Sequence, residues 1–255
     1  MSPLVLADHF IMTGPTFDLH PHAGMSAVTL LFESTRGRMS SHDSVHNNHL
    51  IEPGDLHWTL AGSGIVHTQR PHGENAWLDG LQLFVNLPAR LKRTEPTTLL
   101  LRAADVPVIE YEGARLRVLA GDLAGVRSPL QPPEPILIVD GRLHAGAHAT
   151  LPLPEGWNLW LYVRAGSMAA REVAATVDNG VALASGQAAT VSAAANGNVE
   201  LHGPDGEVAF VAIAGPAIHE PVIQLGPFVM NSRAEADQAL ADFQAGKFGT
   251  VPSFA

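Results

Sequence analysis

Three histidines and one glutamine are spaced in this sequence as the ligands of a metal site would be. His20 and His22 are one residue apart in FDLHPHAGMSAVTLLFE (17–33), and His67 and Gln69 have the same separation in GIVHTQRP (64–71). Residues i and i+2 of a strand point to the same face, so each pair would project together. Neutral imidazole binds first-row divalent metals well. The pattern predicts a transition-metal site with His20, His22, His67 and Gln69 as its ligand set.

The segments around these pairs must be strands that fold back on one another. Pro21 lacks an N–H group, so His20–His22 is expected at the edge or the start of a strand. Between the pairs, the PGD sequence at 53–55 and the AGSG sequence at 61–64 are turn signals. A lone HxH pair is weak evidence, but a partner histidine placed after a PGD turn makes it more specific. Gln69 remains open as a ligand, because a carboxamide oxygen coordinates only weakly.

Composition indicates a globular β protein. Of the 255 residues, 46% are hydrophobic and 16% charged, and the 24 glycines and 19 prolines suit short strands joined by tight turns. The formal charge of −10 argues against direct nucleic-acid binding, and the absence of cysteine excludes disulfides and thiolate sites. The sequence shows no signal peptide and no transmembrane segment, so we expect a cytoplasmic protein without a membrane partner.

One helix is expected, near the end of the chain. Ser232 and Glu235 form a capping box, and Gly246 suits the helix end, which predicts a helix within 231–247. The helix would carry one apolar stripe, formed by Ala236, Ala239, Leu240 and Phe243. The remaining strand-like runs divide into two halves. We therefore predict a metal-binding barrel at 1–103 and a second barrel at 104–255 that includes the helix.

The chain resembles the pirin family of bicupin proteins over nearly its whole length. The matching segments are DLHPHAGMSAVTLLFE, MSSHDS, IEPGDLHWTLAGSGIVHTQ, LQLFVNLPARLK and EPVIQLGPFVMNSRAEADQALADFQAGKFG. The resemblance implies two cupin barrels, the second one degenerate and without an HxH pair. It also implies one metal in the first barrel, most often Fe(II), with Zn, Ni, Cu and Mn as alternatives, held by His20, His22 and His67. The fourth family ligand is a glutamate, where this chain has Gln69.

Some pirins cleave flavonols such as quercetin with dioxygen, and others act in transcriptional regulation through protein partners. Gln69 cannot neutralise metal charge and is no base for a substrate hydroxyl proton, so the replacement weakens the dioxygenase expectation more than the metal expectation. A metal-bound hydroxide or a neighbouring histidine would have to serve as the base. Three hypotheses stay open, namely a flavonol dioxygenase, a metal-dependent regulatory protein and a scaffold with an empty site.

Other side chains have weaker claims to a role. His42, in the family's HxDS stretch, is a candidate spare ligand or base, whereas His46 and His49 are expected in a polar loop. Asp18 and Asp55 are candidate hydrogen-bond acceptors for the ligand histidines, although turn capping is the simpler role for Asp55. Two sets remain. Trp58, Phe32 and Phe84 are expected to pack in the core, with one or two lining an aromatic pocket, and His144, His148, His202 and His219 are assigned no role.

Overall fold

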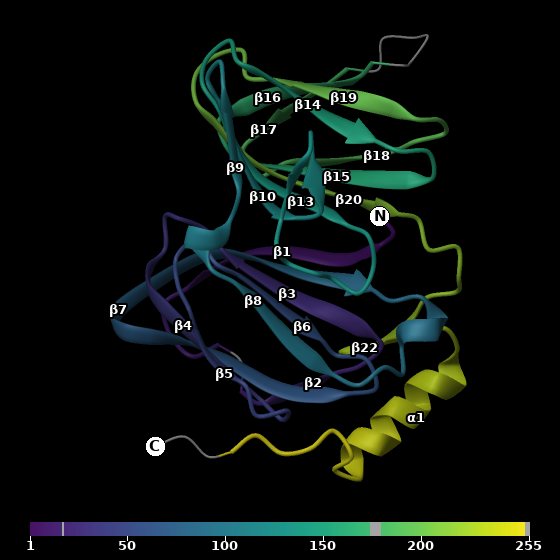
Figure 1. Cartoon of the computed structure of the whole chain (residues 1–255). Coiled ribbons are helices and arrows are strands. Elements are labelled where there is room, and N and C mark those ends of the chain that lie inside the picture. Colours follow the sequence, from purple (N-terminus) through teal and green to yellow (C-terminus); the bar gives the residue numbers. More distant parts are fainter. Residues whose placement is uncertain (17, 174–179, 253–255) are drawn as a thin grey trace. The chain divides into compact units, whose positions relative to one another are not determined.

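The computed structural model of this chain describes residues 1–16, 18–173 and 180–252, and it contains two compact units. The first unit comprises Leu4–Ala104 and the chain from Ile218 onward, and the second comprises Met1–Pro3 and Asp105–Ala217. Each unit is built from strands (Figure 1), and one α-helix lies near the C-terminus. The predicted all-β class with two barrels and a terminal helix is confirmed. No helix in the described part of the chain has the length and apolar character that crossing a bilayer requires.

The first unit is organised around one long strand. Its strands are β1 (Leu4–Met12), β2 (His20–His22), β3 (Met25–Leu31), β4 (Arg36–Asp43), β5 (Asn48–Ile51), β6 (Leu56–Leu60), β7 (Ile65–Asn86), β8 (Thr97–Leu101), β21 (Ile223–Leu225) and β22 (Phe228–Met230). Their order is β5-β4-β7-β3-β6-β8, and β1 and β2 also pair with β7. The first part of β7 pairs with β2 and β4, and the part from Leu78 onward pairs with β1 and β3. β7 therefore belongs to both walls of the barrel, and positive φ values at Gly73 and Asn75 mark an irregularity between its two parts.

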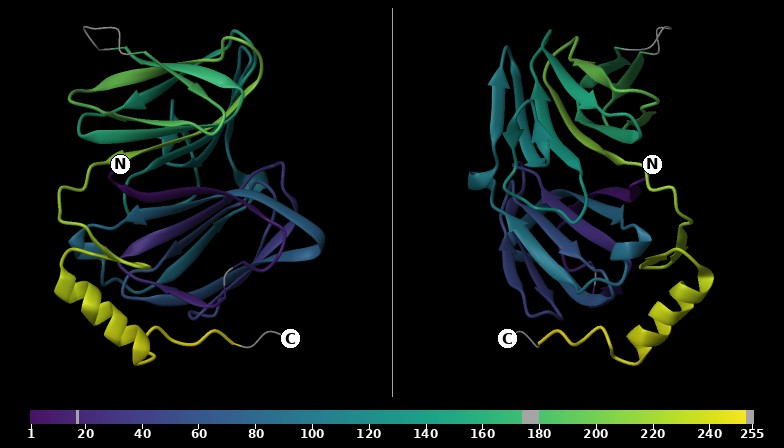
Figure 2. Two further views of the ribbon diagram at one scale, coloured as in Figure 1. Left: turned by 180° about the vertical axis from the view of Figure 1, so that it is seen from behind. Right: turned by 45° about the vertical axis from the view of Figure 1, so that its right-hand side comes forward.

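The terminal helix α1 (Arg233–Gln244) packs in the first unit, whereas the predicted division placed it in the second. Its cap is as predicted, because the Ser232 side chain accepts a hydrogen bond from the backbone N–H of Glu235. Leu240 is 37% exposed, so the prediction that it belongs to the buried apolar stripe is wrong. α1 belongs to the first unit because the chain returns to that unit before the helix begins. There, Val229 donates its backbone N–H to the carbonyl of Ala23, next to β2. Figure 2 shows α1 outside the barrel strands of this unit.

Lys92 fastens this returning segment to the barrel from within. The side chain is 3% exposed, and Nζ donates to the carbonyls of Gly24 (2.9 Å) and Val229 (2.8 Å) and to Oδ1 of Asn86 (2.7 Å). Burial lowers the pKa of Lys92 to about 8, although Glu220 and Glu235 oppose the shift. The lysine joins three separate segments, and it follows the short 3₁₀ helix Ala89–Leu91.

Lys92→Met is expected to lower the free energy of unfolding by about 3 kcal/mol, because three buried oxygen acceptors lose a charged donor. Urea unfolding of the purified variant measures this change. Lys247→Met is the matched control, since exposed Lys247 pairs with Asp242 at the surface, and its effect should stay within about 0.5 kcal/mol. Equal stabilities of the two variants would contradict the assigned role of Lys92.

The second unit is a barrel with an apolar interior. Its strands are β9 (Val108–Tyr111), β10 (Ala114–Ala120), β11 (Asp122–Leu123), β12 (Val126–Arg127), β13 (Leu137–Leu143), β14 (His148–Leu153), β15 (Trp157–Ala165), β16 (Ser167–Glu172), β17 (Val181–Ala184), β18 (Ala188–Ser192), β19 (Gly197–His202) and β20 (Val208–Pro216). They form the sheets β18-β15-β20-β13-β10-β9 and β14-β19-β16-β17, beside the pair β11-β12. Leu116, Val139 and Phe210 belong to one continuous apolar cluster.

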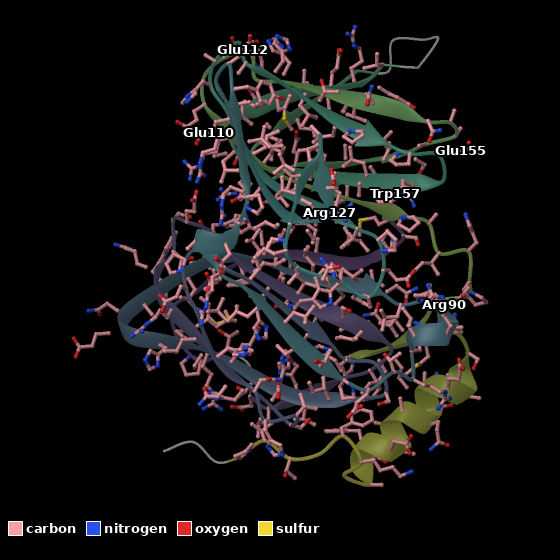
Figure 3. All side chains as sticks on the ribbon, viewed as in Figure 1. Arg90, Glu110, Glu112, Arg127, Glu155 and Trp157 are labelled. Carbon is pink, nitrogen blue, oxygen red and sulfur yellow. The ribbon has the colours of Figure 1, made fainter. Side chains whose placement is uncertain are left out.

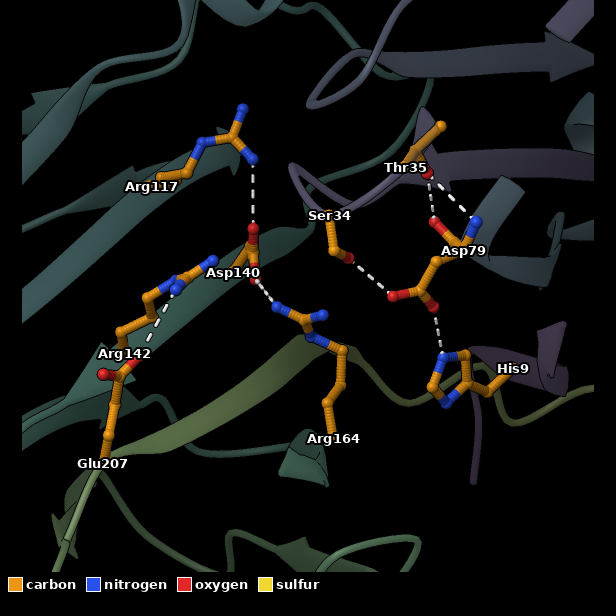
Figure 4. Close-up of polar contacts among 9 residues, drawn as sticks. All are labelled: His9, Ser34, Thr35, Asp79, Arg117, Asp140, Arg142, Arg164 and Glu207. Atoms are coloured by element: carbon orange, nitrogen blue, oxygen red, sulfur yellow. Dashed lines mark hydrogen bonds and ion pairs between the residues drawn. The ribbon is translucent and has the colours of Figure 1, made fainter. Parts of the chain in front are cut away.

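Charged residues of the second unit lie away from this cluster. Glu110 on β9 and Glu112 after it are exposed (Figure 3). Buried Asp140 accepts a hydrogen bond from Arg117 at 3.0 Å and pairs with Arg164 at 3.6 Å (Figure 4). Asp140 neighbours Val139 on the same strand, so its side chain points to the opposite face of the sheet from the apolar cluster. The interior of this barrel is therefore a packed apolar core.

Candidate metal centre

Three imidazoles meet on the inner wall of the first barrel. Strand β2 pairs with β7 so that His20 lies opposite His67 and His22 opposite Ile65. The ring centroids of His20, His22 and His67 are 4.5–4.9 Å apart, and one nitrogen from each ring lies within 4.8 Å of the others. His22 and His67 are 3% and 2% exposed, whereas His20 is half-buried. The predicted convergence of the three histidines is thus present in the structure.

The imidazoles of these histidines are neutral, so each has a nitrogen lone pair available for a metal. Nδ1 of His20 lies 2.9 Å from the carbonyl oxygen of Asp18, which can only accept, so Nδ1 carries the proton and Nε2 the lone pair. Burial lowers the pKa of His22 to about 3, with His20 adding to the shift and the carbonyl of Pro227 opposing it. Burial and the neighbouring histidines also lower the pKa of His67 well below its ordinary value. The buried rings are therefore neutral near pH 7, as metal ligation requires.

The spacing of the nitrogens fits a shared cation. Nε2 of His20 and Nε2 of His67 are 3.0 Å apart. Two nitrogens bound about 2.1 Å from one ion and about 90° apart would stand about 3.0 Å from each other. The same distance suits a hydrogen bond in the absence of a metal. The donor set of imidazole nitrogens suits Fe, Ni, Cu or Zn rather than Mg or Ca.

Gln69 lies two residues after His67 on β7, so the two side chains point to the same face of the strand. It is 7% exposed, and its Oε1 lies 3.0 Å from the hydroxyl of Thr29. Its Nε2 is buried and has no hydrogen-bond partner among the residues that the structure describes. Gln69 thus has a buried polar group left to satisfy, and its place in the ligand set stays a prediction.

A row of side chains from the other wall faces this set. Thr29 on β3 lies between Gln82 on β7 and His57 on β6. Nε2 of His57 is 3.2 Å from Nδ1 of His49, and burial lowers the pKa of His57 to about 3. His57 is not among the residues that the sequence predicts for the site. Its signal was present in LHWTL, where His57 and Thr59 alternate with apolar residues, but such a polar face usually meets solvent.

His42 lies on the wrong face for the predicted role of spare ligand or base. It pairs with Thr68, which sits between His67 and Gln69 on β7 and therefore points to the opposite side of the sheet. There, His42, Thr68, Arg70 and His72 line an outer cavity of about 730 Å³. Sequence separation alone could not reveal this parity, which depends on the register between β4 and β7.

Most of the other residues considered as candidates have structural roles. The Asp55 carboxylate accepts backbone N–H groups from Glu52 and Ala103 and pairs with Arg102, which confirms its turn-capping role. Asp18 serves His20 through its carbonyl oxygen, while its exposed carboxylate meets Arg70. His46 lies in the expected loop and has a positive φ.

The aromatic residues divide as follows. Trp58 and Phe32 are buried, at 1% and 0% exposure, whereas the Phe84 ring stands 5.2 Å from the His22 ring at the site. His49, expected in a loop, lies on β5 and contacts His57. Away from the centre, in the same unit, Asp79 accepts hydrogen bonds from His9 and Ser34 (Figure 4).

Comparisons with known proteins agree with this geometry. Residues 3–85 match the family model of pirin, and residues 138–249 match the model of the pirin C-terminal cupin domain. Pirin from Homo sapiens is 34% identical over 250 residues, which cover 98% of this chain and 83% of the human protein. Pirin-1 from Arabidopsis thaliana is 34% identical over 261 residues, covering 98% and 84% of the two chains.

Two solved structures extend the comparison. Quercetin 2,3-dioxygenase from Acinetobacter baumannii superposes with a TM-score of 0.85 at 29% identity, covering 98% of this chain and 87% of that one. The bacterial pirin YhhW from Escherichia coli, in complex with nickel(II), gives a TM-score of 0.65 at 16% identity, with 85% and 84% coverage. The second likeness concerns the fold alone. Both comparisons agree with the predicted pair of cupin barrels.

Proposed function

Because this chain belongs to the pirin family, we propose that its first barrel binds one divalent transition metal through His20, His22 and His67 and cleaves flavonol-like aromatics with dioxygen. The observation that carries the metal part is the convergence of three neutral imidazoles inside the barrel. The substrate class is supported by the likeness to the Acinetobacter quercetin dioxygenase. Fe(II) is the proposed metal, with Ni, Zn, Cu and Mn as alternatives.

The residues around the site would have separate roles in metal and substrate binding. His20, His22 and His67 would hold the metal, which when bound supplies Lewis-acid and redox chemistry toward dioxygen and a substrate hydroxyl. The Phe84 ring beside His22 offers an apolar surface for an aromatic substrate. Half-buried His20 marks the side of the site nearest to solvent.

A second candidate function is favoured by the weakness of the available bases. Gln69 has no basicity, and the lowered pKa of His57 makes that imidazole a poor acceptor of a hydroxyl proton. A metal-binding pirin without efficient turnover would act as a regulatory protein that responds to its metal state and contacts a protein partner. No direct nucleic-acid contact is proposed, given the charge of −10.

Metal content and oxygen uptake separate these functions. Protein purified anaerobically with Fe(II) is expected to contain close to one metal per chain, and Gln69→Glu to bind it more tightly because the carboxylate neutralises one charge. With quercetin, Gln69→Glu should consume oxygen on the order of tenfold faster, since it restores a base of the kind that is worth about 10²-fold or more in catalysis. A loaded wild type without oxygen uptake would favour the regulatory function. If the wild type contains no metal and only the Gln69→Glu variant binds it, the enzyme proposal is wrong.

A further inference from the structure

The hydroxyl of Thr29 stands between two amide oxygens and cannot serve both. It lies 3.0 Å from Oε1 of Gln69 and 2.9 Å from Oε1 of Gln82. A threonine hydroxyl has one proton to donate and otherwise accepts. One of the two amides must therefore present its NH₂ group to Thr29. The two ends of an amide have nearly the same shape, so its orientation follows from the hydrogen-bond network.

Turning either amide makes both contacts of Thr29 hydrogen bonds, so the two arrangements differ in which buried atom of Gln69 is left over. If Gln82 turns, its Nε2 donates to Thr29 and Thr29 donates to Gln69, but Nε2 of Gln69 stays buried without a partner. If Gln69 turns, its Nε2 donates to Thr29, and Thr29 donates to Oε1 of Gln82. Both close contacts are again hydrogen bonds, and the buried atom of Gln69 left over is now its carbonyl oxygen. An unsatisfied buried polar group is costly, and a cation can satisfy the oxygen but not the N–H group, so a metal held by the three histidines favours the second arrangement.

The turned amide places its carbonyl oxygen where Nε2 now stands. Gln69 shares a strand face with His67, and His67 lies opposite His20 on β2. A buried carbonyl oxygen on this wall needs a donor or a cation as its partner. A metal held by the three histidines would supply one, because amide oxygen is a competent though weak ligand.

We propose that Thr29 and Gln82 are positioning residues that hold the Gln69 amide with its carbonyl oxygen toward the metal. This inference rests on the metal part of the proposed function and not on the dioxygenase part. The resulting ligand set, three imidazoles and one amide, is neutral, so the metal keeps both positive charges. Such a site selects an anionic molecule, a carboxylate or a deprotonated hydroxyl, as its additional ligand.

The test uses Co(II) alone as the probe, titrated into the metal-free full chain and followed by calorimetry and visible absorption. Thr29→Val removes the hydroxyl but keeps the shape, and it should weaken Co(II) binding about 10- to 100-fold, as loss of residues that orient a ligand does. It should also change the Co(II) absorption spectrum. Thr29→Ser keeps the hydroxyl and should bind as the wild type does.

The decisive comparison repeats Thr29→Val in a Gln69→Ala background. If Thr29 acts through Gln69, the second substitution has no further effect on the dissociation constant or the spectrum. Gln82→Met gives an independent check, because the Thr29 proton would then return to the Gln69 oxygen and compete with the metal. Its weakening of Co(II) binding should likewise vanish in the Gln69→Ala background. Circular dichroism and thermal midpoints of the metal-free variants confirm that each is folded.

Several results would overturn the proposal. Unchanged Co(II) binding in Thr29→Val is one, and an equal loss in the presence and absence of Gln69 is another, since Thr29 would then act on the fold. A wild type that binds no Co(II) removes this proposal together with the metal site. A wild type that binds Co(II) with the expected coupling, but whose Fe(II) form does not consume oxygen with quercetin, removes only the dioxygenase function.

Discussion

Replacing His67 with alanine is expected to empty the metal centre. His67 is the most deeply buried of the three histidines, with its Nε2 3.0 Å from Nε2 of His20 and its ring 4.9 Å from that of His22. Substitution of residues that merely orient a ligand costs about 10- to 100-fold in affinity, so loss of a ligand from a three-imidazole set should cost at least about 100-fold. Metal analysis of the purified variant and a Ni(II) titration of its metal-free form measure the change.

His148→Ala is the matched control for this experiment. His148 is exposed on β14 of the second unit, where its ring stacks on that of His202. The control removes one imidazole from the surface and should leave metal content unchanged. If His67→Ala retained close to one metal per chain, His20 and His22 would have to hold it with other groups, and the proposed ligand set would be wrong.

The sequence predicted this cluster because its two halves each obey a local rule. The i, i+2 spacing of His20 and His22 placed them on one face before any tertiary fact was known. The turn signals between His22 and His67 indicated that the segments fold back. What spacing could not supply is the partner of each strand, and the pairing of His20 with His67 is a long-range event. The family resemblance supplied that step.

Residues whose role depends on register were harder to predict. His42 was assigned to the site because it is near in sequence and matches a family segment, yet its pairing with Thr68 puts it on the outer face. His57 was overlooked because a polar face of a strand usually faces water, whereas in this barrel it faces the ligands. Helix α1 was assigned by chain order to the wrong unit, since nothing local in its sequence specifies which barrel receives its apolar side.

Acid is expected to destabilise the metal-free protein over a wide pH range. The pKa values of His22 and His57 are lowered to about 3 by burial, and that of His67 lies well below its ordinary value. In the unfolded chain these residues bind a proton near pH 6.5. Between about pH 6.5 and 3 the unfolded state therefore binds more protons than the folded state. Stability is full above pH 6.5 and is lost as the pH falls through this window.

The size of the effect follows from the number of buried imidazoles. Each group that stays neutral in the folded state costs about 1.4 kcal/mol for every pH unit below the unfolded pKa, so His22, His57 and His67 together give roughly 4 kcal/mol per unit. A domain with a typical stability of about 5–15 kcal/mol would unfold within a few units. Urea unfolding in the presence of a chelator, repeated from pH 7.5 to 4.5, gives the slope.

His57→Gln separates this cause from the general titration of carboxylates. Glutamine stays neutral at every pH, and its amide can replace the contact that His57 makes with His49 at 3.2 Å. The variant should therefore lose about one third of the acid slope, since two of the three buried imidazoles remain. His148→Gln, at an exposed position, should keep the wild-type slope. If His57→Gln and the wild type lost stability in parallel below pH 6, His57 would take up its proton without unfolding, and its burial would not set its pKa.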